Sequence, residues 1–106
     1  MKNGLYKVAV STAFGTGAGV VTLMDGRIRG GDSAISYIGQ YAEDGGHFVA
    51  NVTIKRHTAG VPSLLGNDQI AVAFQGKADD DRVSLLGSVP AVPGVGFQAR
   101  LEFISD

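Results

Sequence analysis

Apolar and polar residues alternate with a period of two along most of this 106-residue chain, and glycine-rich turns separate the alternating stretches. Such alternation is typical of β-strands that bury one face and expose the other. The 16 glycines do not cluster as they would in a flexible linker, so we interpret them as turn and bend positions. Eight strands are predicted, at residues 5–12, 17–24, 27–29, 34–41, 47–56, 69–75, 81–88 and 97–104.

The connections between these stretches determine how the strands pair. A parallel pair needs a long crossover, usually a helix, and no segment of this chain provides one, so the sheet is predicted to be antiparallel. Asp25-Gly26 predicts a type I′ hairpin turn, because both central residues of that turn have positive φ. Closure into a barrel removes exposed sheet edges. We therefore predict one all-β domain over residues 1–106, an eight-stranded antiparallel up-and-down β-barrel with at most one short helical turn, near residues 63–65.

The predicted inward faces combine bulky residues with glycine, as where Gly39 stands between Tyr37 and Tyr41. An eight-stranded barrel is just wide enough for its side chains to fill it, so we expect a filled or nearly filled interior. The alternative is a small apolar ligand site in which tyrosine hydroxyls serve as polar contacts. The residues predicted to line such a site are Tyr6, Tyr37, Tyr41, Phe48 and Phe103.

Charge and composition exclude several classes of function. The formal net charge is -1 and the nine basic residues are scattered, which argues against direct binding of nucleic acid or of an anionic membrane. No apolar run approaches the roughly 20 residues of a membrane span, and the chain opens into a strand pattern instead of a signal peptide. Cysteine is absent, which is compatible with a reducing compartment. We expect a cytoplasmic protein.

No candidate motif for catalysis or cofactor binding has the spacing or neighbouring residues that its function requires. Gly15-Thr16-Gly17-Ala18-Gly19 lacks the spacing and the following helix of a dinucleotide-binding loop. His47 and His57 lie at opposite ends of one predicted strand, about 33 Å apart at roughly 3.3 Å per residue, so they cannot share a metal ion. No base and nucleophile converge in the sequence. We expect no catalytic residues, no cofactor and no metal, and hence no enzyme.

Acidic turns are the strongest candidates for a binding surface. Asp79-Asp80-Asp81 places three carboxylates in one predicted turn, and Glu43-Asp44 belongs to another. These groups could bind a hard cation or face a basic partner, although the alternating ligand spacing of a calcium loop is missing, and they could also be simple solvated turns. The candidate partner surface consists of Glu43, Asp44, Asp79, Asp80 and Asp81.

Gly30-Gly31-Asp32 is predicted to form a bend, with the Asp32 carboxylate accepting hydrogen bonds from the amides of the turn. The alternatives for Asp32 are an interface contact and a site at the mouth of the barrel. An enzyme using tyrosine and carboxylate chemistry would need Asp32 beside Tyr37 or His57 in an open cleft.

Several segments together resemble the GrlR family of negative regulators of type III secretion genes. They are Gly4-Leu5-Tyr6, Gly17 with Gly19-Val20, the run from Asp25 to Ser33, and Tyr37-Ile38-Gly39-Gln40-Tyr41. Farther on, the resemblance rests on Gly66, Gly76 and Gly87. It implies a small lipocalin-like barrel, a homodimer, and repression through binding of a helix-turn-helix transcriptional activator without contact to DNA.

The regulator that names the family binds its activator through a surface run of four acidic residues, Glu-Asp-Glu-Asp, which this chain lacks. A resemblance to a family supports an inference of fold more strongly than an inference of function. Two readings therefore stand beside each other: a non-enzymatic regulator that acts through protein contacts, and a lipocalin-like binder of a small apolar ligand.

Overall fold

The computed structural model describes residues 1–13, 15–58, 69–90 and 94–106. The described residues form eight strands and no helix. The predicted helical turn at residues 63–65 lies outside them. The strands are β1 (Gly4–Thr12), β2 (Gly15–Met24), β3 (Arg27–Gly31), β4 (Ile35–Asp44), β5 (His47–Arg56), β6 (Gln69–Asp79), β7 (Arg82–Ser88) and β8 (Gly96–Ser105).

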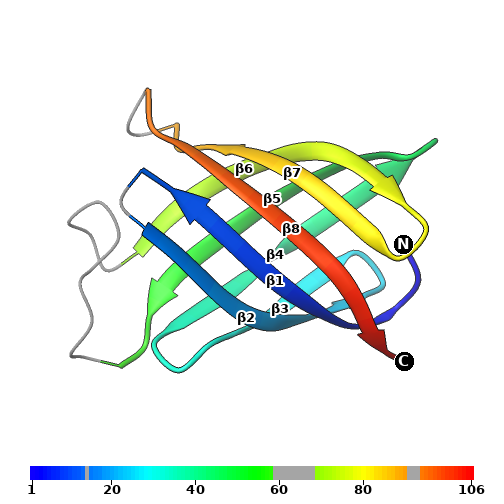
Figure 1. The fold of residues 1–106 in the computed structure, drawn as a ribbon, viewed down its shortest axis with the longest axis horizontal. Helices are drawn as coiled ribbons and strands as arrows, with labels where there is room; N and C mark the ends of the chain where they lie inside the picture. Colours follow the sequence, from blue (N-terminus) through cyan, green and yellow to red (C-terminus); the bar gives the residue numbers. More distant parts are fainter. Residues whose placement is uncertain (14, 59–68, 91–93) are drawn as a thin grey trace.

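Each strand pairs antiparallel with the next one along the chain, and β8 pairs with β1 to close the barrel (Figure 1). This confirms the predicted fold class. The structure differs from the sequence prediction mainly in strand length. β4 continues to Asp44 and β6 to Asp79, because the turns that follow them contain only two residues each. Residues assigned to turns from their composition therefore end strands instead.

The core fills the interior of the barrel. Tyr6, Leu23, Phe48 and Val83 are completely buried, and each lies on the inward face of a different strand. Every buried side chain in the described part of the chain is hydrophobic. The outward positions between them are exposed, as the alternating burial along β5 and β7 shows. The period-two pattern of the sequence is thus the division between lumen and solvent.

Two hairpins use turns in which both central residues have positive φ. Asp25 and Gly26 have φ values of 51° and 85°, and Gly45 and Gly46 have values of 58° and 87°. These signs are those of a type I′ turn, whose twist matches that of the flanking strands. The turn predicted at Asp25-Gly26 is confirmed.

Glycines on the inward faces let neighbouring backbones approach closely where the strands bend. A Cβ atom added at Gly39 would lie 2.0 Å from the Asn51 carbonyl oxygen. At Gly30 the corresponding distance to the Val20 oxygen is 2.1 Å, and at Gly76 the distance to the Ser84 oxygen is 1.8 Å. No side chain larger than hydrogen fits at such distances, so these glycines permit the curvature that closes the barrel.

Candidate functional site at the acidic end of the barrel

Carboxylates gather at one end of the barrel. The β2–β3, β4–β5 and β6–β7 turns lie at this end together with both chain termini (Figure 1). Of the remaining acidic residues, Glu102 lies within β8, Asp32 lies at the opposite end, and Asp68 is outside the described residues. Seven of the ten Asp and Glu residues therefore define what we call the acidic end: Asp25, Glu43, Asp44, Asp79, Asp80, Asp81 and Asp106.

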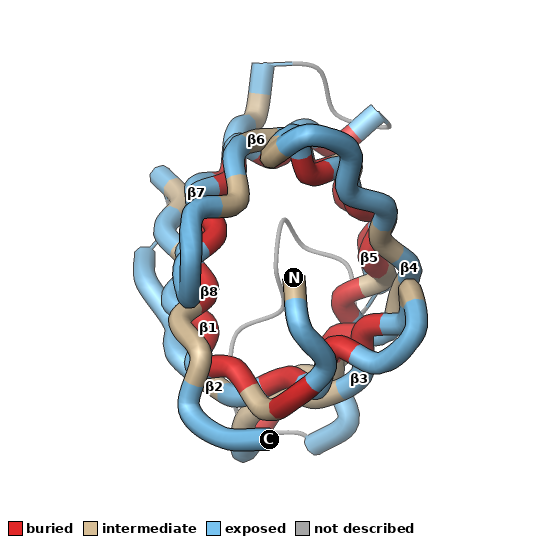
Figure 2. The backbone as a smooth tube through the Cα atoms, turned by 90° about the vertical axis from the view of Figure 1, so that its right-hand side faces the viewer, coloured by how far each residue is buried: buried red, intermediate tan, exposed pale blue. Residues whose placement is uncertain are grey.

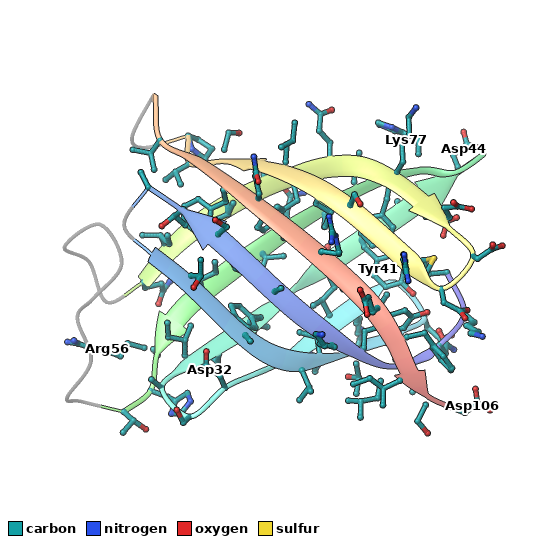
Figure 3. The ribbon with its side chains drawn as sticks, viewed as in Figure 1. Asp32, Tyr41, Asp44, Arg56, Lys77 and Asp106 are labelled. Carbon is teal, nitrogen blue, oxygen red and sulfur yellow. The ribbon has the colours of Figure 1, made fainter. Side chains whose placement is uncertain are left out.

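The structure brings the two predicted acidic turns side by side. Glu43 and Asp44 end β4, and Asp79 to Asp81 connect β6 to β7. The Ala78 amide donates a hydrogen bond to the Gly46 carbonyl oxygen at 2.8 Å, which joins the β4–β5 turn to the end of β6. In Figure 3, Asp44 and Lys77 lie together at this end, and Asp106 lies at the same end of the molecule. All five residues of the predicted partner surface therefore lie at the same end of the barrel.

Hydrogen bonds between neighbouring hairpins hold this end together. The Tyr41 amide donates to the Gly26 oxygen, and the Phe103 amide donates to the Asp81 oxygen, each at 2.8 Å. With the bond from Ala78 to Gly46, each of the three turns is fixed to a later strand. The carboxylates consequently project from a backbone that is hydrogen-bonded on several sides, which reduces the entropy lost when a partner binds.

The first three residues cross the open end of the barrel (Figure 2) and each contacts a different hairpin. The Met1 amino group pairs with Glu43, and Lys2 Nζ lies 3.1 Å from Asp81 Oδ1. Asn3 Nδ2 donates to Asp25 Oδ1 at 3.0 Å, and Lys2 also lies over the Phe103 ring at 3.8 Å. We refer to residues 1–3 as the N-terminal crossing.

The N-terminal crossing divides the predicted partner surface into two parts. Glu43 and Asp81 are already compensated by positive charge. For Asp44, Asp79 and Asp80, no ion pair is formed with any residue in the described ranges, and all three are exposed. These three carboxylates are the accessible negative groups of the predicted partner surface.

Metal binding receives no geometric support in the described part of the chain, where no three His, Cys, Asp or Glu side chains are placed to hold a metal ion. His47 and His57 are exposed, the first beginning β5 and the second directly following it. They lie at opposite ends of the barrel, as their spacing predicts.

The aromatic residues of the predicted ligand pocket pack mainly against one another. Tyr41 stacks on Phe48 with ring centroids 5.1 Å apart, and Tyr6 meets Phe103 edge-on at 5.4 Å. The Tyr6 hydroxyl donates to the Lys2 carbonyl oxygen at 2.6 Å. These two pairs fill the lumen next to the acidic end, whereas Tyr37 lies four residues before Tyr41 on β4, about 13 Å away along the strand.

A small cavity of about 40 Å³ lies in the lumen among the described residues. Tyr37 and Phe48 line it together with aliphatic side chains, and its exposed surface is entirely apolar. Ligand pockets usually have volumes of about 300–1,000 Å³. The space beside Tyr37 and Phe48 is therefore roughly that of one or two water molecules, and Tyr6, Tyr41 and Phe103 do not line it.

Tyr37 should make the stability of the barrel sensitive to alkaline pH. Burial, with a smaller effect from the Asp32 charge, raises the pKa of Tyr37 to about 12. Since the unfolded chain loses this proton near pH 10 and the folded chain does not, the stability is present below pH 10 and is lost as pH rises from 10 to 12. Urea unfolding across this range should show a steeper loss for the wild type than for Tyr37→Phe. Equal pH dependence of the two proteins would contradict this assignment.

Asp32 forms a tight turn after β3. Its Oδ1 accepts hydrogen bonds from the Ala34 and Ile35 amides, both at 2.8 Å. His57 Nε2 lies 3.0 Å from the Asp32 carbonyl oxygen, and the His57 amide donates to the Ala34 oxygen at 2.8 Å. The imidazole thus contacts the backbone of this turn, and the carboxylate holds the bend through the turn amides.

Sequence reasoning missed the N-terminal crossing. Its contacts link residues that are 42 and 22 positions apart, and neither Lys2 nor Asn3 belongs to a motif. Only the closed barrel places the start of β1 beside all three turns.

No protein-family model matches the chain, and no curated protein sequence is significantly similar to it. Within the described ranges there is no helix of the length and apolar character needed to cross a bilayer.

Proposed function

We propose that this protein is a non-enzymatic, cytoplasmic regulator that binds a basic surface of a partner protein through the acidic end of its barrel. The observation that carries the proposal is the convergence of Glu43, Asp44 and Asp79 to Asp81 at one hydrogen-bonded end of the barrel. The resemblance to GrlR regulators supplies the class of partner, a helix-turn-helix transcriptional activator held away from its DNA. It also implies that the regulator is a homodimer.

Electrostatics supports this choice of partner. A protein that binds DNA must present positive charge to the phosphate backbone, and an acidic surface is complementary to that same region. Asp44, Asp79 and Asp80 are exposed and concentrated, so their field should accelerate encounter with a basic protein. The same face repels nucleic acid. The small apolar cavity of the lumen gives less support to a carrier of apolar ligands.

Neutralising the accessible carboxylates should weaken capture of the partner. We expect Asp44→Asn/Asp79→Asn/Asp80→Asn to reduce the association rate with the activator by about tenfold at low salt, because steering depends on these charges. The activator is first retained from extract of the source cells on immobilised wild-type protein and then measured purified, by surface plasmon resonance. The wild-type association rate should fall steeply between low and physiological ionic strength.

Glu102→Gln is the matched control, since Glu102 is half-buried within β8, lies opposite Arg82, and is not one of the three accessible carboxylates. The control should bind as the wild type does, after allowance for one lost charge. Light scattering on the same samples measures the implied homodimer. Unchanged binding by the triple variant would refute the acidic end as the partner surface. Retention of an activator that also binds the triple variant in high salt would refute it as well.

A further inference from the structure

A second charged surface lies on the wall of the barrel, on residues that the acidic end does not include. A groove of about 440 Å³ crosses the outer faces of β3, β4, β5 and β6. Arg27 and Arg29 are the only charged residues that line it. Its outward side chains are Arg27, Arg29, Ile38, Gln40, Asn51, Thr53 and Ala71.

The register of the sheet fixes how these side chains are arranged. Arg29 lies opposite Ile38, which in turn lies opposite Thr53. Arg27 lies opposite Gln40, and Gln40 lies opposite Asn51. Each row therefore begins with a guanidinium on β3 and continues over shorter, uncharged side chains, so that the two arginines stand along one side of the groove.

The two arginines carry uncompensated charge. Both are exposed, and neither forms an ion pair with any residue that the structure describes. Ile28 separates them and points into the core, so both guanidinium groups leave the same face of β3 at a spacing of about 6.6 Å. Guanidinium groups bind carboxylates through paired hydrogen bonds. Gln40, Asn51 and Thr53 add neutral hydrogen-bonding groups beside them.

We propose that this groove binds an acidic segment of a partner protein in extended conformation, with carboxylates at alternate positions facing Arg27 and Arg29. Alternate residues of an extended chain repeat at the same spacing of about 6.6 Å as the two arginines. β3 is paired along its whole length with β2 on one side and β4 on the other, so at the two arginines the segment must be recognised by side chains and not by addition to the sheet. Charge complementarity selects an acidic occupant.

The test uses a short synthetic peptide in which glutamate and serine alternate, titrated into the intact protein. Backbone amide shifts in the nuclear magnetic resonance spectrum should change at residues 27–29, 38–40 and 51–53. Arg27→Gln/Arg29→Gln should weaken binding by about tenfold. Arg27→Lys/Arg29→Lys, which keeps the charge but not the paired hydrogen bonds, should give an intermediate loss. This second variant decides the result if the first one fails to fold.

Lys77→Gln/Arg100→Gln is the matched control, because it removes the same charge from β6 and β8 and should bind the peptide as the wild type does. A peptide with the same number of glutamates at every third position should bind more weakly. The proposal is overturned if the two double glutamine variants lose affinity equally, if peptide spacing has no effect, or if a single-stranded oligonucleotide binds the groove more tightly than the peptide. None of these outcomes depends on the acidic end, so the Asp44, Asp79 and Asp80 variant should bind the peptide at least as well as the wild type.

Discussion

Gly76→Ala should destabilise the barrel by about 3 kcal/mol or prevent it from closing, because the added methyl group meets fixed backbone on the next strand. The new Cβ would lie 1.8 Å from the Ser84 carbonyl oxygen and 3.0 Å from the Leu85 Cα. Neither atom can move without breaking the pairing of β6 with β7, in which Gly76 lies opposite Leu85. The change is purely steric, since the φ of Gly76 is not positive. Urea unfolding followed by circular dichroism measures the loss.

Gly17→Ala is the matched control for this experiment. Gly17 is also a strand glycine without positive φ, but an added Cβ there meets no atom within 4 Å. The control should be neutral or slightly stabilising. Alanine lowers the conformational entropy of the unfolded chain, which raises the free energy of unfolding by about 0.4–1 kcal/mol. If both variants unfold at the same urea concentration as the wild type, close backbone approach at Gly76 is not what shapes this part of the barrel.

Phe48→Ala should cost about 3–5 kcal/mol, because it removes a completely buried ring from the part of the core next to the acidic end. Phe48 stacks on Tyr41 and lines the small lumen cavity, so its removal would enlarge a space that is already apolar. The neighbouring barrel wall is a closed hydrogen-bonded sheet and can collapse only slightly into that space. The free energy of unfolding in urea gives the magnitude.

Val49→Ala provides the comparison on the same strand. Val49 points outward and is 40% exposed, so its truncation should cost less than about 1 kcal/mol. The Phe48 variant should also gain thermal stability in the presence of a small aromatic such as benzene, because enlarged dry cavities bind such molecules. Wild-type protein that is stabilised to the same extent would show that the native lumen opens beyond 40 Å³ and would favour the ligand-binding reading.

The architecture was predictable because each of its determinants is local in sequence. Alternation of the kind seen in β5 marks which side chains face the lumen, and Asp25-Gly26 specifies the turn that follows β2. Strand ends were predicted less well. Glu43, Asp44 and Asp79 are residue types common in turns. Their backbones nevertheless continue the strand pairing, because the turns that follow contain only two residues each.

The candidate surfaces were only partly predictable, since they depend on which segments the barrel places next to each other. The sequence shows Glu43-Asp44 and Asp79-Asp80-Asp81 as two separate clusters, and nothing in it indicates that the Ala78 amide bonds to Gly46. The pairing of Lys2 with Asp81 and the groove beside Arg27 likewise arise from register across the sheet. Charges that are scattered along the chain become segregated only in three dimensions.

The pairing of β8 with β1 also has a consequence for how the protein is made. During synthesis the first seven strands emerge from the ribosome before the strand that completes the sheet, so a nascent chain holds β1 and β7 with unpaired edges. Closure then joins residues as far apart as Tyr6 and Phe103, a long-range contact of the kind that slows folding. We expect the interval before β8 becomes available to be the period in which unpaired strand edges most favour aggregation.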